Sequence, residues 1–187
     1  MCGILFWVLE GLDEEAVRLI ETVHAQKVQH RGTDGTRLMN ANGCLHAFHR
    51  LAIINVNESG MQPFVEGDDV LIGTGEVWNY QELDAELKSE LKSDVEVFLR
   101  MEMTADQIDR VDGDFAFVRS APGRFWAARD VAGVRPLFYA TDASQRPIAF
   151  ASEAKALVAG PGVAKVHVFP PGHVYDSAVD ALVPYHT

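Results

Sequence analysis

The second residue of the chain is a cysteine, a residue type and a position suited to nucleophilic catalysis. Cys2 is small enough to favour removal of Met1, which leaves the α-amine of Cys2 free. An unperturbed α-amine has a pKa of about 7.7–8 and a free cysteine one of about 8.5, so near neutral pH such an amine is partly unprotonated and accepts the thiol proton. A nucleophile and its base then come from a single residue. Taken alone, Met-Cys also fits a chance cysteine or a buried small hydrophobe.

Further motifs follow this cysteine in a fixed order along the chain. They are HRGTDG, HRLAIINVNESGMQPF, TGEVWNYQEL, SDVEVFL, DGDFAFV, ARDVAGVRPLFY, FASEAKAL and PPGH. In this order and spacing the chain resembles the glutaminase domain of class II glutamine amidotransferases, the N-terminal nucleophile type. The closest resemblance is to the glutaminase domain of asparagine synthetase, and it runs from Met1 to about Tyr185.

The resemblance implies both a fold and a reaction. The fold is α+β, the four-layer αββα sandwich of N-terminal nucleophile hydrolases, with the nucleophile on the first strand. In the reaction, the Cys2 thiolate attacks the side-chain amide of glutamine, ammonia leaves, and water hydrolyses the γ-glutamyl thioester to glutamate. Two alternatives stay open: a glutamine-binding or regulatory module that docks to a synthetase, and a hydrolase that acts on a different amide.

Two charged residues match the family's contacts with the α-carboxylate and the α-amine of glutamine. Arg50 is expected to clamp the carboxylate, since a planar guanidinium makes bidentate contacts; the alternative is a surface ion pair. Asp94 is expected to receive the substrate ammonium, although in SDVE it also fits a helix N-cap. The following residues are expected to line the pocket, mainly through backbone groups: Leu51, Ala52, Ile53 and Ile54.

The TGEVWN segment corresponds to the turn beside the substrate. Gly75 is expected to offer its N–H to the developing oxyanion, with Glu76 next to it. Asn79 matches a family asparagine near the site, and a local structural hydrogen bond explains it equally well. Thr74 departs from the family, whose asparagine at this position supplies half of the oxyanion hole. Loss of one such donor costs about 10²–10³ in rate, so the enzyme is slow, is compensated from elsewhere, or binds glutamine without efficient turnover.

Hydrophobic periodicity predicts the elements that hold these residues. HRGTDG reads as a glycine-punctuated loop beside the active site, with a structural role. The expected elements are a buried strand at 3–9, a helix from Asp13 to about Gln29, one or two strands in 44–56, a short strand that runs into a Gly-x-Gly turn within 68–76, helices at 81–91 and 93–103, antiparallel strands after Asp112, a short helix at 153–158 and a final strand.

Composition narrows the class of protein further. A net charge of −11 argues against nucleic acid or an anionic membrane as the main partner, because both select for basic patches. Two cysteines are too few for a disulfide framework, and no signal peptide is evident, which together indicate the cytoplasm. The histidines show no metal-binding spacing, and neither a metal nor another cofactor is expected.

The domain organisation follows from the same resemblance. Residues 1–187 are expected to form a single glutaminase domain, because nothing in them resembles the ATP-binding loop of a synthetase domain. The chain is then either a stand-alone glutaminase or a piece of a longer parent. Its ammonia is expected to reach a separate synthetase, such as an asparagine synthetase-like partner, or to be released.

Overall fold

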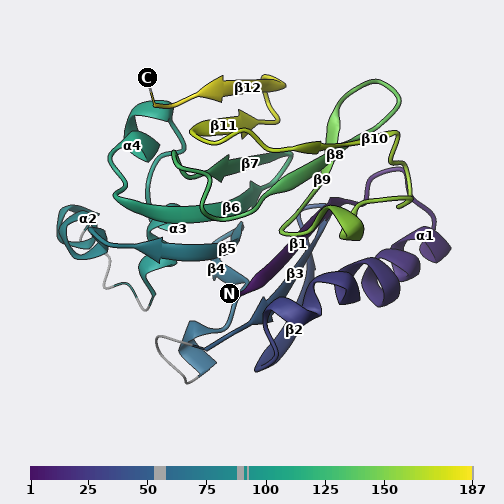
Figure 1. Cartoon of the computed structure of the whole chain (residues 1–187), viewed down its shortest axis with the longest axis horizontal. Coiled ribbons are helices and arrows are strands. Elements are labelled where there is room, and N and C mark those ends of the chain that lie inside the picture. Colours follow the sequence, from purple (N-terminus) through teal and green to yellow (C-terminus); the bar gives the residue numbers. More distant parts are fainter. Residues whose placement is uncertain (53–57, 88–90, 92, 187) are drawn as a thin grey trace.

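The protein is built around two six-stranded antiparallel sheets, as the computed structural model shows for residues 1–52, 58–87, 91 and 93–186 (Figure 1). The first sheet has the strand order β10 (Lys165–Val168), β8 (Phe138–Thr141), β9 (Pro147–Ala151), β1 (Gly3–Val8), β3 (Cys44–Arg50) and β2 (Gly35–Ala41). The second has the order β12 (Ala181–Pro184), β11 (His173–Asp176), β7 (Arg124–Arg129), β6 (Gly113–Ala121), β5 (Asp69–Val77) and β4 (Phe64–Glu66).

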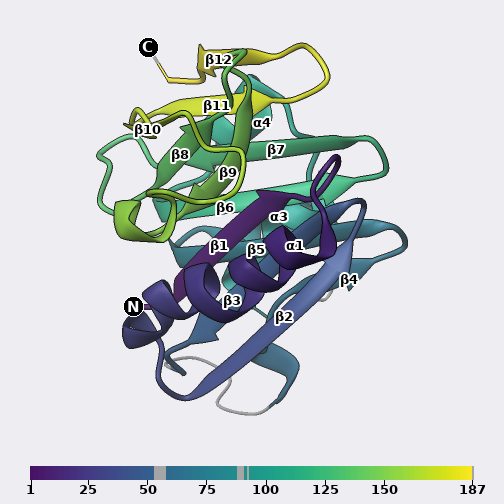
Figure 2. The same ribbon diagram turned by 90° about the vertical axis from the view of Figure 1, so that its right-hand side faces the viewer.

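Helices cover the outer face of each sheet. Over the first sheet, α1 (Glu14–Leu19) continues into a π-helical turn, η1 (Ile20–His24), and a 3-10 segment, η2 (Ala25–Arg31), as Figure 2 shows. The helices over the second sheet are the 3-10 turn η4 (Asp94–Glu96), α2 (Tyr80–Leu87), α3 (Val97–Arg100) and α4 (Ala105–Asp109). Two further 3-10 turns are η3 (Glu58–Gly60) and η5 (Ala154–Ala156). No helix within the described residues is long and apolar enough to cross a membrane.

The first strand shows why the sequence folds into layers. Successive side chains of a strand point to opposite faces. Ile4 and Phe6 face the space between the sheets, whereas Leu5 and Trp7 face the helices. All four are fully buried, which accounts for the uninterrupted apolar run. Buried apolar side chains therefore fill the space between the sheets and the space beneath each helical layer, and the predicted αββα sandwich is confirmed.

Several local expectations needed correction. The predicted N-cap is present, since an oxygen of Asp13 accepts from the N–H of Ala16 at 2.8 Å, but the helix loses its α geometry at Ile20. The helix predicted at 93–103 is a 3-10 turn followed by α3, which ends at Arg100. In the 44–56 segment β3 ends at Arg50, and residues 53–57 lie outside the described part. The elements that the pattern did not predict are β2, β4, β10, β12 and α4.

Candidate active site

Cys2 lies just before β1, beside the end of the neighbouring strand β3. Antiparallel pairing of Gly3 with His49 brings the start of β1 to the end of β3. The Cys2 sulfur accepts from the Leu51 N–H at 3.3 Å and lies 3.5 Å from the Leu51 carbonyl oxygen, to which the thiol donates. The thiol therefore has a fixed position against the backbone of the residue that follows Arg50.

Residues of the HRGTDG segment hydrogen-bond to the backbone around Cys2 and Leu51. Arg31 donates to the Cys2 carbonyl at 3.3 Å and to a carboxylate oxygen of Glu153 at 2.6 Å. Burial favours the neutral form of Glu153, but the hydrogen bond and charge of Arg31 hold its pKa below the usual value. Asp34 accepts from the Ala52 N–H at 2.8 Å, and its own N–H donates to the Arg50 carbonyl at 2.9 Å. The segment thus fixes the backbone on both sides of the thiol.

The two cysteines lie in different environments. Cys2 is half-buried and lines a cavity of about 80 Å³ between the ends of the two sheets. Cys44 is buried at the start of β3, and burial together with the charge of Glu10 raises its pKa to about 12. Since the thiolate is the nucleophile, Cys44 is inert near neutral pH and Cys2 is the candidate.

The cavity around Cys2 brings together residues from four separate segments. The predicted site residues among its lining are Cys2, Arg50, Leu51, Thr74, Gly75, Glu76 and Asp94. Arg50 is 7% exposed and Asp94 9% exposed, so both charges are largely withdrawn from water. Charges of both signs in a small cavity suit a zwitterionic ligand.

Asp94 reaches across to the second sheet instead of capping a helix. One of its carboxylate oxygens accepts from the N–H of Val77 on β5 at 2.8 Å, and the other accepts from the hydroxyl of Ser93 at 3.2 Å. Ser93 occupies the N-cap position and makes no side-chain cap bond. The Val77 N–H of β5 therefore holds the Asp94 carboxylate in place at the cavity wall.

The predicted Gly-x-Gly turn is wrong, because Gly73, Thr74 and Gly75 lie within strand β5, which continues to Val77. Gly75 nevertheless requires glycine for steric reasons. Its φ is +139°, a conformation that L side chains rarely adopt, and a Cβ there would lie 2.0 Å from the carbonyl oxygen of Asp114. Gly73, two residues earlier, is clamped by Gln62, whose amide accepts from the Gly73 N–H at 2.7 Å and donates to its carbonyl at 3.0 Å. Both ends of the Thr74 and Gly75 segment are thus held in place.

Thr74 lies in the cavity wall with its hydroxyl unoccupied. The residue is 3% exposed and lines the cavity with Cys2. No group in the described part of the chain hydrogen-bonds the Thr74 hydroxyl. The position that would carry half of an oxyanion hole therefore holds a free donor on a short side chain.

Two of the predicted site residues that the structure describes, Ala52 and Asn79, are not among the cavity lining. The Ala52 N–H donates to a carboxylate oxygen of Asp34. Asn79 donates to the Arg110 carbonyl at 2.9 Å and accepts from the Asp112 N–H at 3.0 Å, which is the local structural bond foreseen as the alternative. A substrate contact by Asn79 stays a prediction that this geometry does not favour. Two further predicted residues, Ile53 and Ile54, lie outside the described residues.

The cavity also has lining residues that the sequence did not assign to it. They are Met1, Phe48, Gly60, Gln62, Gly73, Ser93, Val95 and Arg135. Gln62 and Arg135 belong to the MQPF and VRPLFY motifs, so a signal existed, but neither motif specified a position near Cys2. The described residues contain no group of three or more His, Cys, Asp or Glu side chains able to hold a metal ion.

An αββα sandwich with a cysteine just before its first strand and a cavity at that cysteine defines an N-terminal nucleophile hydrolase. The comparisons with known proteins agree. A family model described as "Glutamine amidotransferase domain" matches residues 1–177. The chain therefore belongs to the glutamine amidotransferase domain family.

Individual relatives show which proteins this chain resembles in sequence. An asparagine synthetase [glutamine-hydrolyzing] of Zea mays is 36% identical over 195 residues, which cover 97% of this chain and 32% of the relative. A probable asparagine synthetase of Schizosaccharomyces pombe is 36% identical over 196 residues, 99% of this chain and 35% of the relative. The chain thus spans about a third of the length of these curated relatives.

The structural likeness extends to a more distant enzyme and concerns the fold alone. The glutamine PRPP amidotransferase of B. subtilis superposes with a TM-score of 0.73 at 17% identity, over 100% of this chain and 49% of that chain. A glutamine aminotransferase class-II domain protein from Silicibacter pomeroyi gives a TM-score of 0.52 at 11% identity, over 98% of this chain and 96% of that one.

Proposed function

We propose that this domain hydrolyses the side-chain amide of glutamine to glutamate and ammonia through a thioester on Cys2. The observation that carries the proposal is the single cavity that Cys2, Arg50, Gly75 and Asp94 share. It offers a nucleophile, a cation for a carboxylate, a carboxylate for an ammonium and a backbone donor. A substrate with both an amide and an amino-acid head group satisfies all of these.

The positions of these groups suggest how the reaction runs. Removal of Met1 exposes the α-amine of Cys2, which takes the thiol proton as the sulfur attacks the amide carbon. The N–H of Gly75 stabilises the developing oxyanion. The α-amine then returns the proton to the leaving ammonia and activates the water that cleaves the thioester. Arg50 and Asp94 hold the substrate head group throughout.

The proposal is tested by incubating the purified, Met1-processed protein with glutamine and measuring glutamate and ammonia. Intact mass first establishes whether Met1 has been removed, since a retained methionine blocks the base. Stoichiometric labelling by diazo-oxo-norleucine, mapped to Cys2, would show a formed nucleophile. Glutamate release no faster than in buffer, by processed protein and with candidate partners present, would reject the function.

The Asp94→Asn variant is expected to raise KM for glutamine by about tenfold or more while changing kcat less, since a charge-assisted hydrogen bond to the substrate ammonium is lost. Asparagine keeps an oxygen for the Val77 N–H, so the local fold is preserved. Glu96→Gln, which removes a charge from the same 3-10 turn outside the cavity lining, is the control. Equal KM values for Asp94→Asn and wild type would remove Asp94 from the binding site.

A second candidate function is a glutamine-binding or regulatory module with weak catalysis. Thr74 favours it, because asparagine is the family residue at the oxyanion position. Calorimetry would separate the two candidates: heat of glutamine binding without glutamate formation supports the module. Glutamate formation at a rate that depends on Cys2 supports the enzyme.

We further propose that the ammonia serves a synthetase, whether a separate asparagine synthetase-like subunit or a further part of a longer polypeptide. The similarity to asparagine synthetases supports this proposal and supports asparagine biosynthesis as the pathway that the ammonia serves. Both described cysteines are free thiols, which fits the reducing cytoplasm. A change of glutaminase rate when such a synthetase is added would identify the partner.

A further inference from the structure

A partly buried ion pair lies beside the end of strand β5 that contains Gly75. Arg135 donates from its Nε to a carboxylate oxygen of Asp114 at 2.6 Å, and the same oxygen accepts from the N–H of Glu76 at 3.2 Å. The side chains of Arg135 and Asp114 are 12% and 17% exposed, respectively. The peptide between Gly75 and Glu76 is therefore anchored to a charge pair on the neighbouring β6 strand and the loop after β7.

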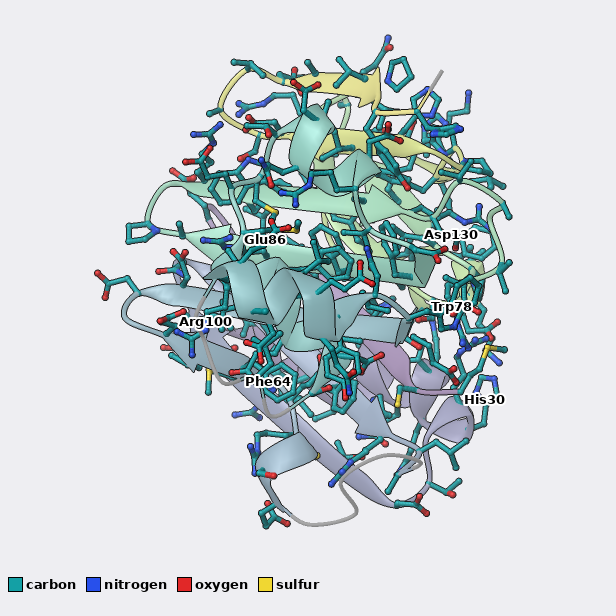
Figure 3. All side chains as sticks on the ribbon, turned by 90° about the vertical axis from the view of Figure 1, so that its left-hand side faces the viewer. His30, Phe64, Trp78, Glu86, Arg100 and Asp130 are labelled. Carbon is teal, nitrogen blue, oxygen red and sulfur yellow. The ribbon has the colours of Figure 1, made fainter. Side chains whose placement is uncertain are left out.

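The loop that presents Arg135 is itself rigidly held. Asp130 is 1% exposed, and its two oxygens accept from the N–H groups of Val134 at 2.9 Å and Arg135 at 3.0 Å. The guanidinium of Arg129 donates to the carbonyls of Arg135 and Gly133, each at 2.7 Å. Asp130 and Trp78, which follows β5, both lie along the right-hand edge of Figure 3. These bonds fix the loop and so the position of the Arg135 guanidinium at the cavity edge.

Side chains give strand β5 little support at Gly75 and Glu76 beyond its backbone pairing with β6. Glycine has no side chain to restrict its backbone, and the exposed Glu76 side chain packs against little. Gly75 pairs with Phe115 of β6, and the N–H of Glu76 donates to the side chain of Asp114 on the same strand. In a chain with net charge −11, Arg135 also balances Asp114 beside the carboxylates of Glu76 and Asp94.

We propose that Asp114 and Arg135 are positioning residues that fix the Gly75–Glu76 peptide and thereby aim the Gly75 N–H at the oxyanion. This inference rests on the proposed function. Asp114 acts on the Glu76 N–H directly, and Arg135 acts through Asp114. Substrate binding depends instead on Arg50 and Asp94, so the pair affects the chemical step more than binding.

The kinetic test compares Asp114→Asn, Arg135→Gln and the double variant with wild type. Each single change is expected to lower kcat by about tenfold, the size of one lost charge-assisted hydrogen bond, with KM little changed. Because Arg135 acts through Asp114, the double variant should lose no more than Asp114→Asn alone. Arg135→Lys should restore part of the rate. Arg124→Gln, which breaks the exposed pair with Asp176 at the other end of β7, should leave kcat unchanged.

A second measurement reads the geometry without turnover. The ¹⁵N-labelled Gly75 amide resonance is expected to shift in Asp114→Asn and in Arg135→Gln but not in Arg124→Gln. If wild type released no glutamate, the proposed function would fail while this amide shift still tested the pair. An unmoved Gly75 resonance, an unchanged kcat, or additive losses in the double variant would each overturn the inference. Unfolding of both single variants at the assay temperature would overturn it too, because the pair would then be a stability anchor.

Discussion

Replacing Cys2 with alanine is expected to lower glutamine turnover by about 10⁴-fold or more, the loss typical of a removed nucleophile. The thiol has no substitute in the cavity: the other cysteine, Cys44, is buried elsewhere with its pKa raised to about 12. Alanine at position 2 is small, so Met1 removal and the fold are preserved. The measurement is glutamate release at saturating glutamine.

Cys44→Ala provides the matched control, because it removes the other thiol from β3 without touching the cavity. This variant should keep wild-type turnover once its folded fraction is verified by circular dichroism. Glutamate release that survives in Cys2→Ala would assign the activity to a contaminant or to a different nucleophile.

The Thr74→Asn variant is expected to raise kcat by about 10²–10³, the value of one oxyanion-hole donor. Thr74 lines the cavity beside Gly75, and its hydroxyl has no partner in the described part of the chain. An asparagine amide extends one bond further than the threonine hydroxyl and carries two donor hydrogens. It would therefore complete the site that the Gly75 N–H begins.

A companion variant, Thr74→Val, separates two explanations of the wild-type rate. Valine keeps the shape of threonine without the hydroxyl, so a fall in kcat would show that the hydroxyl already assists, directly or through water. If Thr74→Asn binds glutamine in calorimetry yet gains no rate, a missing donor is not the whole defect.

The sequence predicted the layers of the fold because their signals are local. The apolar run of β1 requires burial on both faces, and the alternating aromatic segments after Asp112 require antiparallel strands. The helix from Asp13 was predicted from its cap, but its change to π geometry at Ile20 was not. That change depends on packing against the first sheet, which no short segment encodes.

In the candidate site too, some residues could be predicted from local motifs and others depend on the folded chain. Cys2, Arg50, Gly75 and Asp94 were found from ordered motifs, and the cavity brings them together. The part played by Arg135 could not be predicted, because it depends on a strand pairing and a loop that meet only in the folded chain. Asp94 shows the limit most clearly. Its segment fits a helix cap, and only the position of β5 gives its carboxylate a different partner, the Val77 N–H.

The position of Met1 has a consequence for how the protein matures. Met1 lines the cavity of about 80 Å³, and its sulfur lies 3.8 Å from a guanidinium nitrogen of Arg31. Met1 thus forms part of the cavity wall beside Cys2. We expect the newly made chain to become active only after an aminopeptidase removes Met1 and frees the α-amine of Cys2. A purification tag placed ahead of Met1 is expected to keep the α-amine of Cys2 blocked, whereas one placed after β12 lies at the outer edge of the second sheet (Figure 1).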